Sequence, residues 1–168
     1  WKYMSFDESA AAFSTFVKNL DTALENRIKQ IAEHYKGRLH SYDVVNESAE
    51  DDYANLIPEG HAVARSRYGV MNGDYPYKSL KWAEKYFPKE VALNINDYFK
   101  KPCYTAQTSR LIERGCKSDV MGLQMHLFDL ALCQGIADGW KVQTPSQVRE
   151  YIGYANQTGL PLHLSEIT

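Results

Sequence analysis

The sequence predicts an α/β fold in which short parallel strands alternate with helices. Two observations support this fold class. First, four stretches with helical spacing of apolar residues alternate with four short strand-like stretches. Parallel neighbours need a long crossover, usually a helix, so this order indicates repeated strand-helix units. Second, 168 residues suffice for one compact core but fall short of a complete eight-stranded α/β barrel, which needs about 250 residues.

The helices are expected over residues 9–35, 77–86, 104–114 and 144–156. In the first of them, apolar residues recur at intervals of three and four, which is typical of an amphipathic helix. Gly37, Pro88 and Gly115 follow the first three helices as stop signals. Thr144 precedes Pro145 at the start of the fourth helix, where a capping hydroxyl and a first-turn proline are both favoured.

The strands are expected over residues 39–47, 91–96, 120–127 and 160–167. The first combines Tyr42 with the β-branched pair Val44 and Val45, a composition that favours strands. Residues 48–74 form a connection much longer than the usual strand-to-helix loop of about 2–6 residues. Long loops after strand ends are common places for the sites of α/β enzymes.

Composition excludes several classes of protein. The chain has 19 Lys and Arg residues against 21 Asp and Glu residues, with no basic stripe of the kind that binds nucleic acid. No apolar run approaches the ~20 residues of a membrane span. Residues 1–5 lack the positive start and following apolar run expected of a signal peptide, which means little where residue 1 lies inside a longer protein. The three cysteines lack the paired spacing of a structural zinc site.

Polar side chains end each predicted strand. By strict alternation, the sets expected to share a face are Asp43, Val45 and Glu47; Asn94, Asn96 and Tyr98; Gln124 and His126; and Leu162, Leu164 and Glu166. Because the carboxyl ends of parallel barrel strands converge, these groups should meet at one rim. Two carboxylates among neutral hydrogen-bonding groups are the set that glycoside cleavage requires.

Each signal has a simpler explanation when taken alone. An acid at a strand end usually faces water or caps the next helix, and His126 alone fits a hydrogen-bonded, half-buried histidine. His163, on the opposite face from Glu166 by alternation, is expected to pack outward against a helix. Asp51 and Asp52 fit a solvated loop better than a metal site. The combination of strand-end groups favours a site.

Four ordered motifs resemble those of glycoside hydrolase family 10, the endo-β-1,4-xylanases. The segment 42–47, Tyr-Asp-Val-Val-Asn-Glu, resembles the W-D-V-V-N-E motif of strand four, and 94–98, Asn-Ile-Asn-Asp-Tyr, resembles the N-D-Y segment of strand five. Residues 122–127, Gly-Leu-Gln-Met-His-Leu, are similar to G-L-Q-x-H-L of strand six, and 162–167 to strand seven. Residues 35–38 also match the Y-K-G-K entry to strand four. Together the motifs cover nearly the whole chain.

The resemblance implies roles for individual residues. Glu47 would be the general acid/base and Glu166 the nucleophile. The implied substrate-binding residues are Asn46 at the sugar 2-hydroxyl, Gln124 near Glu166, His126 as the partner that orients Glu166, and Asn96 and Tyr98 on the leaving-group side. No metal and no cofactor is implied.

The chain departs from the family motifs at Tyr42, Ser165 and Thr168, where the family usually has Trp, Thr and Asp. In the family's order it runs from helix three to strand seven, so residues 1–168 are expected to be part of a single catalytic domain with a partial (β/α)8 TIM barrel. The remaining strands would lie elsewhere in a larger enzyme. A carbohydrate-binding module, inserted in or flanking the barrel, is a possible companion.

The resemblance implies a retaining endo-1,4-β-xylanase that hydrolyses xylan or xylo-oligosaccharides through a covalent glycosyl-enzyme intermediate. A polymeric substrate implies a secreted or cell-surface enzyme. Two alternatives stay open: a non-catalytic barrel remnant that binds polysaccharide, and a related retaining β-glycanase with another substrate.

Overall fold

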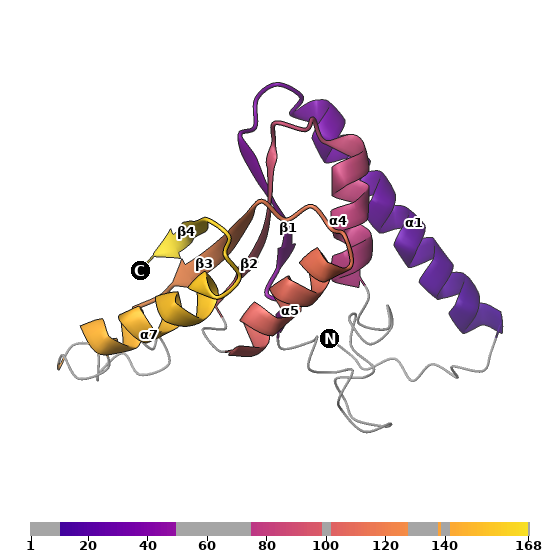
Figure 1. Ribbon diagram of the computed structural model, residues 1–168. Coiled ribbons are helices and arrows are strands. Elements are labelled where there is room, and N and C mark those ends of the chain that lie inside the picture. The colour runs from indigo at the N-terminus through magenta and orange to yellow at the C-terminus, as the bar shows by residue number, and fades with distance from the viewer. Residues whose placement is uncertain (1–10, 50–74, 99–101, 128–137, 139–141, 168) are drawn as a thin grey trace.

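The structure, a computed structural model, describes residues 11–49, 75–98, 102–127, 138 and 142–167. Helices and strands alternate along the chain (Figure 1). The elements are α1 (Ala11–His34), β1 (Ser41–Asn46), α4 (Tyr75–Tyr86), β2 (Ala92–Asp97), α5 (Pro102–Glu113), β3 (Val120–Met125), α7 (Pro145–Asn156) and β4 (Leu162–Ile167). The predicted helices and strands are therefore confirmed, with ends that differ by at most two residues within the described ranges.

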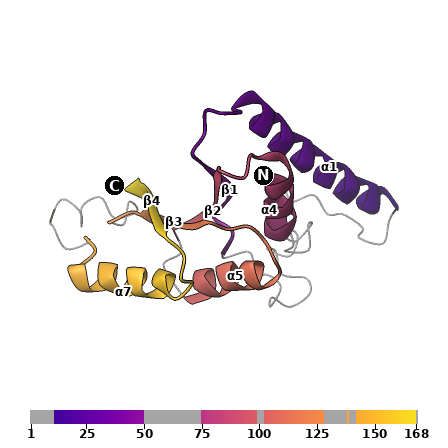
Figure 2. The same ribbon diagram turned by 45° about the horizontal axis from the view of Figure 1, so that its top comes forward.

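The four strands form one parallel sheet in the order β1-β2-β3-β4. Strands that follow one another in the chain are neighbours in the sheet, and a helix connects each pair. This arrangement confirms the predicted fold class. α5 and α7 lie along one side of the sheet, and α1 packs on α4 as the outermost helix (Figure 2).

Two apolar clusters fill the space between sheet and helices. The larger joins α4, α5, β2, β3 and α7 through buried residues that include Leu80, Ile95, Leu111, Leu123 and Ala155. The smaller packs Ile28 and Ala32 of α1 against Ala83, Phe87 and Leu93. The helical periodicity of α1 thus buries one stripe against α4, as an amphipathic helix requires.

The predicted start of the fourth helix is confirmed. Thr144 caps α7 through a reciprocal capping box with Gln147, and Pro145 occupies the first turn. This arrangement satisfies backbone N–H groups that have no partner within the helix.

The two inner strands alternate regularly. On β2, Leu93 and Ile95 are fully buried in the helix-facing clusters, whereas Asn94 and Asn96 carry the polar face. On β3, Gly122 lies beside both asparagines, and a Cβ atom there would come within 2.6 Å of Asn94 Nδ2 and 2.8 Å of Asn96 Oδ1. Glycine is required because the asparagine amides occupy the space that a side chain would take.

The alternation predicted for β1 is wrong. Asp43 pairs with Asn94 and Val45 pairs with Ile95, so β1 contains one extra residue at this point. Asp43 accepts a hydrogen bond from Asn94, while Val45 is buried opposite Ile95. The bulge resets the alternation, which puts Asp43 and Asn46, rather than Asp43 and Val45, on the polar face.

The alternation predicted for β4 is wrong for the same reason. Leu164 pairs with Leu123, yet Glu166 pairs with Gln124, so Ser165 is the extra residue. The expectation that His163 packs outward against a helix is also wrong. It pairs with Gly122 on the polar face, and its side chain is exposed.

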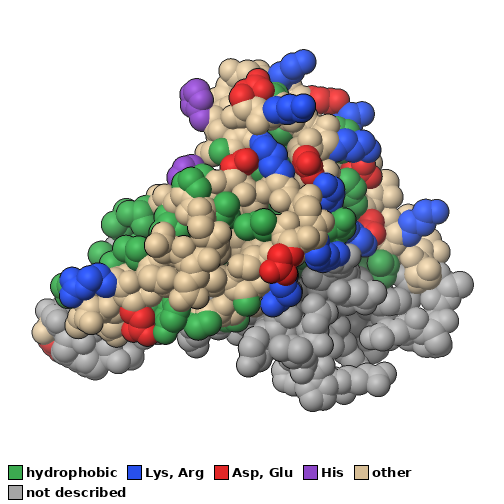
Figure 3. Space-filling model, in the orientation of Figure 1, with side chains coloured by type: hydrophobic (Ala, Val, Ile, Leu, Met, Phe, Trp, Pro, Cys, Tyr) green, Lys and Arg blue, Asp and Glu red, His purple; other side chains and the backbone are tan. Residues whose placement is uncertain are grey.

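β4 lies at an edge of the described sheet and carries an exposed apolar surface. Leu164 and Ile167 are 60% and 63% exposed. Hydrophobic side chains gather on this part of the molecule, over α7 and β4 (Figure 3). None of the described helices is long and apolar enough to cross a membrane.

Candidate active site

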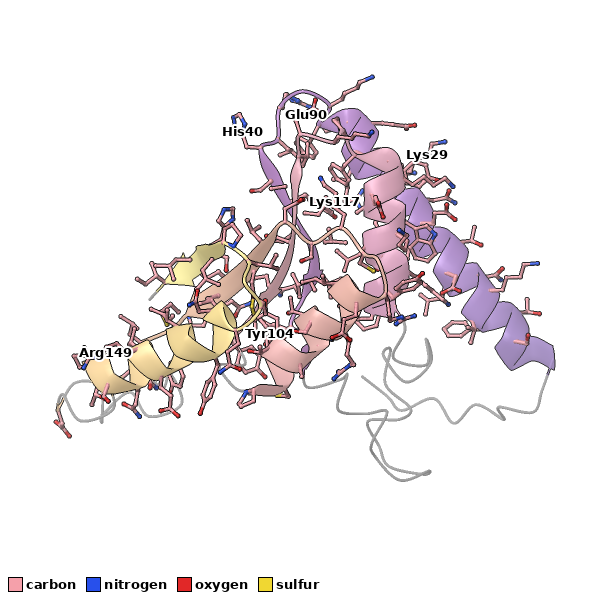
Figure 4. The ribbon with its side chains drawn as sticks, viewed as in Figure 1. Lys29, His40, Glu90, Tyr104, Lys117 and Arg149 are labelled. Carbon is pink, nitrogen blue, oxygen red and sulfur yellow. The ribbon has the colours of Figure 1, made fainter. Side chains whose placement is uncertain are left out.

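The polar ends of all four strands meet in one hydrogen-bonded group of side chains. This strand-end cluster consists of Asn46, Glu47, Asn96, Gln124, His126 and Glu166. It lies at the carboxyl ends of the strands, opposite the end where His40 and Glu90 mark the starts of β1 and β2 (Figure 4). The structure therefore brings together six of the seven predicted site residues.

Gln124 connects β3 to the first carboxylate. Its Nε2 donates to Asn46 Oδ1 and to Glu47 Oε1, both at 3.1 Å. Its Oε1 lies 3.3 Å from His126 Nε2. The side chain is only 2% exposed, so the donors and the acceptor of one buried amide are held in fixed directions.

Glu166 receives contacts from two other strands. Asn96 Nδ2 donates to Glu166 Oε1 at 3.2 Å, and His126 Nε2 lies 3.5 Å from Glu166 Oε2. Asn96 Nδ2 also donates to Asn46 Oδ1 at 2.8 Å. The Glu166 side chain is nevertheless 45% exposed, so the carboxylate is held in place and still accessible from solvent.

The two carboxylates are thus joined by a short chain of polar contacts. Glu47 contacts Gln124, Gln124 contacts His126, and His126 contacts Glu166. In this series of contacts, Glu47 meets an amide nitrogen of Gln124 and Glu166 meets an imidazole nitrogen of His126. These contacts fix the orientation of the two carboxyl groups.

Glu47 has an unusual backbone conformation. Its φ is 57°, and it is the one non-glycine residue with positive φ in the described ranges. This conformation costs a residue with a Cβ atom about 1–2 kcal/mol. The backbone N–H of Glu47 donates to Asn96 O at 2.8 Å, and the next two residues, Ser48 and Ala49, are fully buried. The strand ends at Asn46, so Glu47 reaches the cluster through this turn and not by strand alternation.

Two contributors to the site escaped sequence reasoning. The Ser165 hydroxyl donates to Asn96 Oδ1, which fixes the amide so that its nitrogen points to Glu166. Gly122 leaves the space that the asparagine amides fill. The sequence offered one signal for each: Ser165 directly precedes Glu166, and Gly122 lies two residues before Gln124.

The seventh predicted residue, Tyr98, directly follows β2 with its side chain 42% exposed. Asp51 and Asp52 lie outside the described residues, as does Thr168. In the part of the chain that the structure describes, no three His, Cys, Asp or Glu side chains are grouped to hold a metal ion.

Comparisons with known proteins identify the family. The family described as "Glycosyl hydrolase family 10" matches residues 4–168. Endo-1,4-beta-xylanase A of Halalkalibacterium halodurans is 33% identical over 110 residues, which are 62% of this chain and 26% of that protein. Endo-1,4-beta-xylanase A of Caldicellulosiruptor saccharolyticus is 26% identical over 149 residues, which are 86% of this chain and 39% of that protein.

Solved structures agree with the sequence comparison. The crystal structure of xylanase 10B from Thermotoga maritima superposes with a TM-score of 0.66 and 25% identity, over 89% of this chain and 43% of that one. The matches thus span between 26% and 43% of these relatives' length. The chain belongs to glycosyl hydrolase family 10, and its four strands with their helices are a part of that family's (β/α)8 barrel.

Proposed function

We propose that the protein containing this chain is a retaining endo-1,4-β-xylanase and that residues 1–168 are one portion of a single catalytic barrel. The observation that carries the proposal is the chain of contacts from Glu47 through Gln124 and His126 to Glu166. It connects two accessible carboxylates from different strands at the end of the barrel where catalytic groups are found. The names of the relatives support xylan as the substrate.

Glu166 is the nucleophile in this proposal. Asn96 Nδ2 donates to Oε1 and His126 Nε2 lies 3.5 Å from Oε2, so the carboxylate that attacks the anomeric carbon is held in position. The attack forms a glycosyl-enzyme ester and breaks the bond to the leaving oxygen. Retaining enzymes hold the two carboxyl groups about 5–5.5 Å apart so that both can act on one bond.

Glu47 is the general acid and then the general base. In the first step it donates its proton to the departing glycosidic oxygen. In the second step the resulting carboxylate removes a proton from water, which hydrolyses the ester and restores Glu166. Gln124 Nε2, 3.1 Å from Glu47 Oε1, directs this carboxyl group through both steps.

The neutral residues of the cluster would bind the sugar or orient the nucleophile. Asn46 would bind the 2-hydroxyl of the sugar at the cleaved bond, while Asn96 and Tyr98 would act on the leaving-group side. His126 would orient Glu166, consistent with its position 3.5 Å from Oε2. Sugar hydroxyls both donate and accept, so a site of amides and a histidine suits them.

Substrate and location complete the proposal. Xylan or xylo-oligosaccharides are the substrates, no cofactor takes part, and a polymeric substrate implies a secreted or cell-surface enzyme. A carbohydrate-binding module would add affinity for the polymer. The alternatives are a barrel remnant that binds sugar without cutting it and a retaining enzyme for another β-glycan.

The experiment that tests the proposal replaces each carboxylate in the full-length protein. Glu47→Ala and Glu166→Ala should each reduce xylan hydrolysis by on the order of 10⁴-fold or more. Azide should restore turnover of activated aryl xylosides. The product should be the β-glycosyl azide with Glu47→Ala and the α-glycosyl azide with Glu166→Ala, because azide replaces the water in one variant and the nucleophile in the other.

The matched control is Glu150→Ala, which removes an exposed glutamate of α7 and should leave hydrolysis unchanged. Unimpaired cleavage of xylan by Glu166→Ala would contradict the proposal. Hydrolysis of another β-glycan at a higher kcat/KM than xylan would support the rival substrate, and binding of xylan without reducing-sugar release by the full-length protein would support the remnant. The 168-residue piece alone should be inactive, because its edge strands are unpaired.

A further inference from the structure

We propose that Gln107 is a positioning residue for Glu47, acting through a buried turn that contains Ser48 and Ala49. The proposal rests on the function proposed above, because it assigns a task to the acid/base role of Glu47. Gln107 belongs to α5 and is separated from Ser48 by 59 residues in the chain.

The turn is held by hydrogen bonds at three successive residues. Glu47 N donates to Asn96 O at 2.8 Å, and Ala49 N donates to Asp97 Oδ2 at 2.9 Å. Between them, Ser48 is held by both ends of the Gln107 amide. Ser48 Oγ donates to Gln107 Oε1 at 3.0 Å, and Gln107 Nε2 donates to Ser48 O at 3.1 Å.

The environment makes these bonds strong constraints. Ser48 is fully buried, and Gln107 and Asp97 are each 1% exposed. Water cannot replace a lost partner at such depth without rearrangement, so the amide and the carboxylate fix the path of the backbone. Glu47 is exposed at the first position of this turn, in the left-handed conformation at φ 57°.

α5 is itself fixed to the sheet on the same face. Tyr104 lies three residues before Gln107, and its hydroxyl contacts Ile95 O at 2.7 Å and Gly122 O at 2.8 Å. Residues three apart share a helix face, so one side of α5 contacts both the sheet backbone and the turn. Tyr104 lies between α5 and the sheet (Figure 4).

The consequence is that Gln107 fixes a backbone conformation that Glu47 would not prefer by itself. Without the two hydrogen bonds between Gln107 and Ser48, Glu47 should relax toward ordinary negative φ values. Its carboxyl group would then move away from Gln124 and from the glycosidic oxygen. Loss of Gln107 should then impair proton donation more than sugar binding or nucleophilic attack.

The test uses Gln107→Met in the full-length protein, because methionine keeps the volume and removes both hydrogen bonds. We compare kcat/KM for phenyl and dinitrophenyl β-xylobiosides. Dinitrophenolate departs without a proton, whereas phenolate needs the general acid. We expect a loss of about 10- to 100-fold with the phenyl substrate and less than about 3-fold with the dinitrophenyl substrate.

The matched control is Thr105→Val on the same helix. It removes a partly buried hydrogen bond from Thr105 Oγ1 to Tyr154 O, which joins α5 to α7 and does not involve the turn. It should change both substrates equally. Should Gln107→Met fail to fold, Ser48→Ala removes only the hydroxyl bond and should give a smaller loss with the same substrate dependence.

Equal losses on both substrates with Gln107→Met, or the same selective loss with Thr105→Val, would overturn the positioning role. Glu47→Ala distinguishes this failure from a failure of the function. If Glu47→Ala loses activity selectively with the phenyl substrate, Glu47 remains the general acid whatever Gln107 does. If Glu47→Ala shows no selectivity, the acid role and the positioning role both fail.

Discussion

The inner and outer strands of the sheet contribute to the candidate site in different ways. β2 and β3 are buried along nearly their whole length and pair with each other in continuous register. They supply neutral amides, Asn96 and Gln124. β1 and β4 are more exposed, each contains one extra residue, and they lead to Glu47 and Glu166.

The inner strands therefore supply the rigid part of the site, and the outer strands supply its reactive groups. The inner amides, Asn96 and Gln124, are fixed by close packing and by hydrogen bonds, so they hold the two carboxylates in position. The carboxylates lie at the ends of bulged strands, Glu47 one residue past β1 and Glu166 within β4, in exposed positions that a substrate can reach. Bulges commonly occur next to active sites because they re-aim side chains.

The largest loss of activity should come from removing an inner amide while Glu47 and Glu166 are both kept. Gln124→Met deletes the donors to Asn46 and Glu47 and the acceptor for His126. We expect kcat on xylo-oligosaccharides to fall by about 10²-fold, because preorganised donors at a reacting group are worth that much.

The measurement is steady-state kinetics with circular dichroism to verify folding. The control is Gln157→Met, which changes an exposed glutamine at the end of α7 and should keep kcat unchanged. Activity of Gln124→Met within twofold of the original would show that Glu47 and Glu166 keep their positions without the inner amide.

The next effect concerns stability of the inner strands. In Gly122→Ala the new Cβ would lie 2.6 Å from Asn94 Nδ2, which forces the asparagine layer to move. Overpacking of this kind should lower the free energy of unfolding by about 1–3 kcal/mol.

Gly153→Ala is the matched control for thermal or denaturant unfolding. Gly153 lies in α7, and a Cβ atom there would have no neighbour within 4 Å. The change should raise stability by up to about 1 kcal/mol, because alanine favours helix. Equal behaviour of the two variants would contradict the close approach at Gly122.

The smallest effect is expected at the bulge of an outer strand. Ser165→Ala removes the hydroxyl that donates to Asn96 Oδ1 while leaving the Asn96–Glu166 contact possible. We expect kcat/KM to fall by about 3- to 10-fold, corresponding to one ordinary hydrogen bond. Ser165→Thr should retain most of the activity, and a loss as large as that of Gln124→Met would erase the distinction between the two pairs of strands.

Sequence reasoning predicted the elements, their order and the cap at Thr144, because these depend on local composition and periodicity. It also selected the residues that form the cluster. It failed on which residues share a face in β1 and β4. Register is set by hydrogen bonds between strands, so the extra residues Val44 and Ser165 leave no mark in a periodic pattern.

The supporting contacts were equally hidden from the sequence. The Ser48–Gln107 pair joins positions 59 residues apart, and nothing in either local segment indicates the other. The positive φ of Glu47 was also unexpected, since positive φ is typical of glycine.

In the proposed mechanism, Glu166 attacks the anomeric carbon while Glu47 donates the proton and then accepts one. The most direct measurement uses dinitrophenyl β-xylobioside with fluorine in place of the 2-hydroxyl at the cleaved sugar, which slows hydrolysis of the glycosyl-enzyme ester. Mass spectrometry of the intact full-length protein followed by peptide mapping locates the label. We expect one sugar ester on Glu166; a label on Glu47 or on any other residue would contradict the assignment of the nucleophile.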